Sequence, residues 1–348
     1  MKAKYMKYTI LSLTIAILIS SCTKDSVIEP LPIILISDIS NIDVTSASYS
    51  GVISNDGGTL VTERGICWKA GTIPTIADNK TVNGDGAGTF SGKITGLTPN
   101  TKYYIRAYAT NQAGTNYGSY ISFTTLDGAI DADGNVYHAV TIGSQTWLAE
   151  NLKTTKYNDN TNIALLTNGG VWQRTTEGAY SWFNYDGTTY IATYGPLYNW
   201  YAVNSGKLCP VGWHVPSDTE WKTLEIYLQN HDYNFNSVID TDNFDSTNNY
   251  VAKSLASISG WNSSTNMGAT GNIDFQTYRN KSGFNAFPAG LRYEDGSCLG
   301  IGGRTYWWSS TELWTKYAWR RGIDALNNSL LKDYELKNTG LSVRCVKN

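Results

Sequence analysis

The sequence predicts a small all-β sandwich followed by a larger α+β unit. Residues 33–126 contain short strand-like runs that are each ended by turn residues, such as Asn55-Asp56-Gly57-Gly58, and this spacing is typical of a β-sandwich. Residues 127–348 add one clear helix start among strand-like runs and long loops rich in Gly, Asn and Ser. Aromatic residues make up 13% of the chain and charged residues only 16%, which favours a folded, β-rich protein over a disordered one.

The N-terminus has the layout of a secretory signal peptide. Three lysines precede an apolar run over residues 8–19, and two serines then lead to Cys22. The apolar run is shorter than the roughly 20 residues that a membrane-spanning helix needs, so we predict a signal peptide over residues 1–21. The sequence Ile19-Ser20-Ser21-Cys22 resembles the bacterial lipobox, and this resemblance implies cleavage before Cys22 and lipidation of its thiol.

Residues 22–32 are predicted to form a tether, because two prolines and mixed charges suit a spacer. The lipobox resemblance implies an exported protein whose partner is the membrane, through the lipid on Cys22. Thr23 rather than Asp follows the cysteine, which by resemblance to bacterial sorting signals favours the outer membrane. Lys24-Asp25 resembles a charged surface-export signal, so we expect an outer-membrane lipoprotein that is exposed at the cell surface.

Residues 33–126 also contain a local motif. The run Gly96-Leu97-Thr98-Pro99-Asn100-Thr101-Lys102-Tyr103 resembles the E–F corner of fibronectin type III domains. The resemblance implies that Tyr103 is the tyrosine corner, with its hydroxyl bonded back to the backbone. No second cysteine lies in this range, so we expect Cys67 to be a buried free thiol beside Trp68.

The unit over residues 127–348 opens with Asp131-Ala132-Asp133-Gly134-Asn135, which admits two interpretations. The pattern resembles the start of an EF-hand calcium loop, but that loop needs a bidentate Glu at its twelfth position. Ile142 stands there instead, and strand-like residues flank the motif. We therefore favour a hairpin turn.

One helix is signalled by a capping box. Ser217 is followed three residues later by Glu220, so that each side chain can bond the other's backbone N–H. The next apolar residues, Trp221, Leu224 and Leu228, share one helix face. A second, shorter helix is predicted over residues 250–257, with three apolar side chains directed inward: Val251, Leu255 and Ile258.

Six sequence blocks in the second unit, in order along the chain, carry a resemblance to a known family. They are residues 147–152 (WLAENL), 197–202 (LYNWYA), 209–217 with 220–221 (CPVGWHVPS and EW), 282–292 (SGFNAFPAGLR), 306–312 (YWWSSTE) and 341–346 (LSVRCV). Together they are similar to the Fibrobacter succinogenes major paralogous domain (FISUMP), and this similarity runs over nearly all of residues 127–348. The resemblance implies an exported protein or lipoprotein.

The same blocks resemble the formylglycine-generating-enzyme branch of the C-type-lectin-like fold. That resemblance implies an α+β domain with two helices, a mostly antiparallel twisted sheet, and terminal strands that are neighbours. It also implies a disulfide between Cys209, just before the helix, and Cys345, on the last strand. The alternative is two buried thiols. Cys298 has no obvious partner, and the absence of a CxxC motif argues against a structural zinc site.

Residues on which enzymes of this fold group depend are missing. Formylglycine-generating enzymes bind copper through a cysteine pair, whereas the matching stretch Trp308-Ser309-Ser310-Thr311-Glu312 has no cysteine. Related enzymes need three histidines around iron, and His138, His214 and His231 are not spaced for such a site. No two carboxylates stand out as an acid–base pair. We expect no enzymatic activity, metal or cofactor, and the formal charge of −2 without a basic patch argues against a nucleic-acid partner.

A binding function fits the sequence better, with a glycan or protein ligand at the cell surface. The candidate ligand-binding residues are Asp240, Asp242, Asp245, Trp261 and Trp314. The aspartates offer the oxygen ligands that calcium prefers, although the sugar-binding triplets of C-type lectins are absent and a solvated polar loop is the simpler interpretation. The tryptophans offer stacking surfaces for sugars. Two alternatives stay open: a structural component of the envelope without a small ligand, and, less favoured, an enzyme of this fold.

Overall fold

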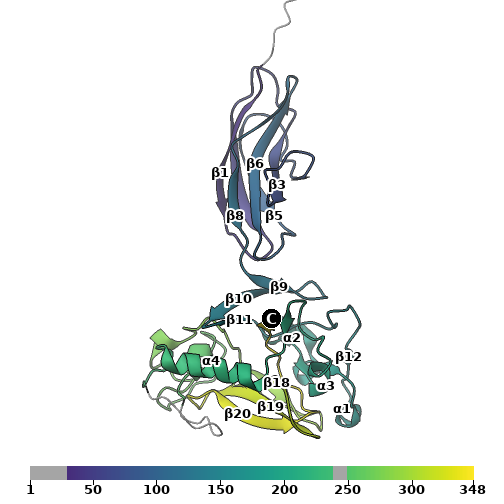
Figure 1. Ribbon diagram of the computed structural model, residues 1–348, viewed down its shortest axis with the longest axis vertical. Helices are drawn as coiled ribbons and strands as arrows, with labels where there is room; N and C mark the ends of the chain where they lie inside the picture. Colours follow the sequence, from purple (N-terminus) through teal and green to yellow (C-terminus); the bar gives the residue numbers. More distant parts are fainter. Residues whose placement is uncertain (1–29, 238–248) are drawn as a thin grey trace, which may run out of the picture.

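The computed structural model describes residues 30–237 and 249–348. The predicted signal peptide, Cys22 and most of the tether lie outside the described residues, as do Asp240, Asp242 and Asp245. The described chain is mostly β-structure with few helices. Figure 1 shows a narrow unit of long strands above a broader unit that carries the helices and the remaining strands. No helix in the described ranges is long and apolar enough to cross a membrane.

Eight strands form the first unit. They are β1 (Ile33–Ser40), β2 (Ala47–Asn55), β3 (Glu63–Ala70), β4 (Asn79–Lys80), β5 (Gly88–Ile94), β6 (Lys102–Asn111), β7 (Gly114–Tyr117) and β8 (Ile121–Thr124). One sheet has the order β1-β2-β5 and the other β4-β3-β6-β7, with β8 also paired to β6. Apolar side chains from both sheets meet in one core, including Tyr49, Ile66, Phe90 and Ile105. This arrangement is a β-sandwich, as the alternation of strand-like runs and turns predicted.

The tyrosine corner is confirmed. The Tyr103 hydroxyl accepts a hydrogen bond of 3.0 Å from the Thr98 backbone N–H, and the Tyr103 ring stacks on Phe123 with centroids 5.9 Å apart. The bond ties the loop before β6 to the strand itself. Cys67 is a buried free thiol, also as expected, and burial raises its pKa.

The turn interpretation of residues 131–135 is confirmed as well. Strand β9 (Gly128–Ile130) pairs with β10 (Val136–Ile142) in antiparallel register. The Asp131 carboxylate accepts hydrogen bonds of 2.9 Å from the backbone N–H groups of Asp133 and Asn135, so it closes the turn. The described part of the chain holds no cluster of three His, Cys, Asp or Glu side chains that could bind a metal ion.

The second unit contains three small sheets. The strands after β10 are β11 (Gln145–Leu148), β12 (Ala164–Leu165), β13 (Ala179–Ser181), β14 (Leu197–Tyr198), β15 (Trp213–His214), β16 (Ala289–Arg292), β17 (Cys298–Ile301), β18 (Arg304–Trp314), β19 (Tyr317–Asp324), β20 (Leu331–Leu336) and β21 (Val346–Lys347). The sheet orders are β15-β21-β11-β10-β9, β12-β13-β14 and β17-β16-β18-β19-β20. Strand β21 therefore lies between β11 and β15, which places the first and last strands of the unit in one sheet. Figure 1 shows the C-terminus close to β10 and β11.

The helices are short except for one. They are α1 (Gly169–Arg174), α2 (Gly187–Tyr194), α3 (Trp200–Val203), α4 (Asp218–Asn230) and α5 (Ala252–Leu255), with 3-10 turns η1 (Phe183–Tyr185) and η2 (Gln276–Tyr278). The capping box is confirmed at α4, where Ser217 and Glu220 each bond the other's backbone. Burial acts to raise the pKa of Glu220, but hydrogen bonds from Ser217 and His214 outweigh it and lower the pKa.

The second predicted helix is shorter than expected, and one of its inward residues was wrong. Val251 and Leu255 are buried, but Ile258 is 77% exposed. The helix ends at Leu255 because the backbone is extended from Ala256 onward. The next residue pairs with another segment, since the Ser257 N–H donates to the Ala286 carbonyl. An inter-segment backbone bond thus replaces the last helical turn.

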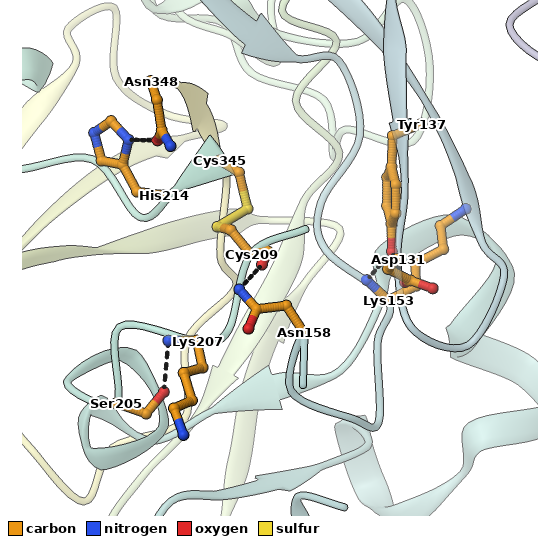
Figure 2. The surroundings of a disulfide bond; sticks show 10 residues. All are labelled: Asp131, Tyr137, Lys153, Asn158, Ser205, Lys207, Cys209, His214, Cys345 and Asn348. Atoms are coloured by element: carbon orange, nitrogen blue, oxygen red, sulfur yellow. Dashed lines mark hydrogen bonds between the residues drawn. A yellow bond between two sulfur atoms is a disulfide. The ribbon is translucent and has the colours of Figure 1, made fainter. Parts of the chain in front are cut away.

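The predicted disulfide between Cys209 and Cys345 is present, with Cα atoms 6.1 Å apart. Figure 2 shows it joining the segment before β15 to the residue before β21. The Asn158 side-chain amide donates to the Cys209 carbonyl at 3.0 Å. The imidazole Nδ1 of His214 lies 2.7 Å from the side-chain oxygen of Asn348. The end of the chain is therefore held by pairing, by polar contacts and by a covalent bond.

Candidate functional site

Four aromatic side chains gather at the end of the β18–β19–β20 sheet where β18 turns into β19. This aromatic cluster consists of Trp314, Tyr317, Trp319 and Tyr334. The Tyr334 ring is at its centre, with ring centroids 5.5 Å from Trp314, 5.5 Å from Tyr317 and 6.3 Å from Trp319. All three pairs meet edge to face, the geometry that aromatic quadrupoles prefer. The rings therefore hold one another in place.

Strand alternation explains why these rings share a face. Trp319 pairs directly with Tyr334, and two residues further along β19 Arg321 pairs with Lys332. Alternate residues of a strand point to the same side, so Tyr317 and Trp319 lie on the face that carries Arg321. Arg321 also pairs with Trp307 of β18, whose ring packs in the core under helix α4. The aromatic cluster is thus a continuation of the face that α4 covers.

Helix α4 covers this face only as far as its first residue. Asp218 forms ion pairs with Arg321 at 2.7 Å and with Lys332 at 3.1 Å. Beyond these pairs, Trp314 is 59% exposed and Tyr334 43% exposed, whereas Trp307 under the helix is fully buried. The same strand face therefore changes from core to exposed aromatic surface at Asp218.

Charged side chains fix the edges of the aromatic cluster. The Lys332 Nζ lies 4.3 Å from the Trp319 ring centroid, a cation–π contact. Lys337 is buried, pairs with Glu312, and donates to the Thr315 carbonyl at 2.9 Å. The second bond holds the turn between Trp314 and Tyr317. The arrangement is chemically a rigid apolar surface with a polar border, which suits stacking on a flat, partly apolar ligand.

The structure separates the residues that the sequence singled out for ligand binding. Trp314 lies in the aromatic cluster. Trp261 packs half-buried against the core, and its indole N–H lies 3.2 Å from both the Ser257 hydroxyl and the Ala286 carbonyl. The three candidate aspartates lie outside the described residues.

Sequence reasoning missed Tyr317, Trp319 and Tyr334. The alternation Tyr317-x-Trp319 was visible and indicates that two rings share a strand face. Their partner Tyr334 could not be assigned without the β19–β20 register. The sequence therefore indicated Trp314 alone, whereas the structure shows a group of aromatic rings from neighbouring strands.

Comparison with known proteins gives the family. The family model of the Fibrobacter succinogenes major domain matches residues 140–347. The chain belongs to the Fibrobacter succinogenes major domain family. The match covers α4, the disulfide and the aromatic cluster, and it confirms the family resemblance of the six blocks. No curated protein matches the chain.

Some solved structures resemble part of this family member. The sensor domain of the anti-sigma factor RsgI4 from Pseudobacteroides cellulosolvens, in its short form, is 21% identical; the match covers 28% of this chain and 97% of that one, with a TM-score of 0.23. The sixth fibronectin type III domain of human fibronectin type III domain containing protein 3 is 23% identical, with coverages of 28% and 82% and a TM-score of 0.21.

Proposed function

We propose that this protein is an exported lipoprotein whose second unit binds carbohydrate on the aromatic cluster. The observation that carries the proposal is the exposure of Trp314 and Tyr334 on a face that is otherwise core. Exposed aromatic surface of this kind marks ligand or partner sites. The C–H groups on one side of a sugar ring form an apolar plane that matches the face of an indole or phenol.

The support for stacking is that the rings are already in place. The edge-to-face contacts of Tyr334 with three neighbours restrict the rings before any ligand arrives. A preorganised site loses less conformational entropy on binding. The half-buried Tyr317 and Trp319 support the two exposed rings from the side.

We infer a C-type-lectin-like fold for the second unit. Its support is the adjacency of β11 and β21, the disulfide from the segment before α4 to the residue before the last strand, and a mostly antiparallel sheet packed on one long helix. In this proposal the lipid on Cys22 anchors the chain at the outer membrane, and the fibronectin type III-like sandwich displays the second unit at the cell surface. Enzymatic chemistry and a cofactor form no part of the proposal.

Glycan binding by the chain from residue 23 onward tests the proposal. A panel of plant, host and bacterial glycans would be offered with calcium and with a chelator. We expect a hit that survives chelation. Trp314→Ala and Tyr334→Ala should each weaken it by about 5- to 30-fold, since losing a central contact ring costs about 1–2 kcal/mol. Tyr120→Ala is the matched control, because Tyr120 is 50% exposed on the sandwich.

Other outcomes would redirect the assignment. A hit that requires calcium would move the site to Asp240, Asp242 and Asp245. A negative panel would contradict carbohydrate binding. If the mass in solution then rose with concentration for wild type and not for Trp314→Ala, the aromatic cluster would be a self-association surface, and the structural alternative would replace the binding proposal.

A further inference from the structure

A second site lies where four segments of the family region meet. It is a cavity of about 200 Å³. Its walls come from the segment after β11, from the loop before β16 and from the residue before Cys345, and helix α2 contributes Ala192 and Thr193 at one side. This volume is below the roughly 300–1,000 Å³ of typical ligand pockets, so the cavity suits a very small ligand or one terminal group of a larger ligand.

The buried side chain at this cavity is Arg344, which is 0% exposed. Its guanidinium donates to the carbonyls of Leu148 at 2.9 Å and Phe284 at 2.5 Å, and to the Asn151 side-chain oxygen at 3.0 Å. Its Nε has no hydrogen-bond partner in the part of the chain that the structure describes. Buried charges normally require a counter-charge, yet none of the ion pairs found in residues 30–237 and 249–348 includes Arg344.

A comparison with Arg321 shows the kind of ion-pair partner that Arg344 does not have among the described residues. Arg321 is equally buried, at 1% exposure, and has the Asp218 carboxylate at 2.7 Å. Arg344 instead stacks on the Phe284 ring at 4.2 Å, and its hydrogen bonds within the described residues all go to neutral oxygens. Burial lowers its pKa to about 9, so it still carries its charge at neutral pH.

Among the other charges at the cavity, Glu150 opposes the effect of burial on the pKa of Arg344, but it forms no ion pair with Arg344 among those found in the described residues. Lys153 is a second cation in the wall. The one carboxylate there, Glu150, is engaged by His138: its oxygens accept from the His138 backbone N–H at 3.0 Å and lie 2.8 Å from the imidazole Nδ1. Two cations, Lys153 and Arg344, therefore line the cavity beside a carboxylate that already pairs with His138.

We propose that this cavity binds a small organic carboxylate. The anion would bind beside Lys153 and Arg344 and supply the ion-pair partner that the guanidinium does not have among the described residues. Charge-assisted hydrogen bonds from such donors are about twice as strong as neutral ones. Phe287 provides an apolar wall for the carbon skeleton. The carboxylate of an acidic sugar and that of a peptide terminus share this chemistry.

Titration calorimetry on the chain from residue 23 onward tests the site. The probes are glucuronate for an acidic sugar, N-acetylalanine for a peptide terminus, and their neutral counterparts glucose and N-acetylalaninamide. We expect one of the two carboxylates to bind with one-to-one stoichiometry and its neutral counterpart not to bind. Which carboxylate binds identifies the source of the ligand.

Two variants at the cavity and two controls locate the site. Lys153→Gln should weaken binding by about tenfold, since a hydrogen bond to a charged group is lost. Ala192→Trp adds bulk at an exposed wall position and should abolish binding. Lys156→Gln and Thr188→Trp change the same loop and the same helix at positions outside the cavity and should bind like wild type. Circular dichroism confirms that each variant is folded.

Two results would overturn the proposal. One is no heat and no shift of Tm with either carboxylate. The other is equal affinity of Lys153→Gln and Lys156→Gln, which would place any binding elsewhere. The Trp314→Ala variant should bind the carboxylate normally, so failure here is distinct from failure of the aromatic cluster to bind carbohydrate.

Discussion

The sandwich and the unit after it satisfy their backbone polar groups in different ways. In the sandwich, β3 and β6 pair along their full overlap from Glu63 to Ala70. A continuous ladder of backbone hydrogen bonds therefore satisfies most polar groups of these strands. Several strands of the second unit are only two residues long. There, buried cations donate to carbonyls: Arg344 to Leu148 and Phe284, and Lys253 to Asn272. The second unit therefore depends on individual side chains and on its disulfide, whereas the sandwich depends on regular pairing.

The largest test of this contrast is the disulfide. Cys209→Ser should destabilise the second unit by up to about 4–5 kcal/mol, the chain-entropy ceiling for a long closed loop. Differential scanning calorimetry should show its transition at a lower temperature, with the sandwich transition unchanged. Intact-mass measurement of wild type should show two hydrogens fewer than the reduced chain. An unchanged transition for the second unit would contradict the contrast.

The matching test in the sandwich is Tyr103→Phe. It removes the acceptor of the Thr98 N–H in a part-buried hydrogen bond and should destabilise the sandwich by about 1 kcal/mol, the typical net contribution of one hydrogen bond. Urea unfolding followed by tyrosine and tryptophan fluorescence measures the loss. Tyr120→Phe, at an exposed position, is the control. A loss in the second unit instead would show that the two units do not unfold separately.

The smallest expected effect is at the junction of the two units. His138 lies 2.9 Å from Asp43 of the sandwich and 2.8 Å from Glu150. Burial acts to lower the pKa of His138, but hydrogen bonds and charges from Glu150 and Asp43 outweigh it and raise the pKa. The pKa of Asp43 is lowered, mainly by the hydrogen bond from the Val44 backbone N–H, and the charges of His138 and Lys93 act in the same direction.

A raised folded-state pKa sets the sign of the pH dependence. The stabilisation by protonated His138 is fully present below its unfolded pKa of about 6.5 and is lost as pH rises through the folded value. Small-angle scattering of wild type should show more variable orientation of the two units above that value. His138→Gln should be independent of pH over the same range. A wild type that behaves like His138→Gln would exclude the junction contact in solution.

Features made by residues close together in the sequence could be predicted, whereas features made by distant residues mostly could not. The capping box of Ser217 and Glu220 and the tyrosine corner are local, so their motifs were sufficient. The Cys209–Cys345 pairing came from the family resemblance. The aromatic cluster was found only in part, through Trp314, because the place of Tyr334 depends on strand register.

Other features depend on segments that are distant in sequence. Ile258 was misplaced because a backbone bond between Ser257 and Ala286 ends the helix early. The cavity at Arg344 is assembled from segments far apart along the chain, and no sequence pattern indicates that this arginine lacks a carboxylate. Both features are set by tertiary packing that local patterns do not report.

The disulfide also affects how the protein withstands proteolysis. It joins residues 136 positions apart, and the aromatic cluster lies within that interval. A single cleavage anywhere between Cys209 and Cys345 leaves the two fragments covalently joined. A cut between Cys209 and Trp314 would release the fragment with Trp314 and Tyr334 if the disulfide were absent. With the disulfide present, that fragment stays attached to the sandwich.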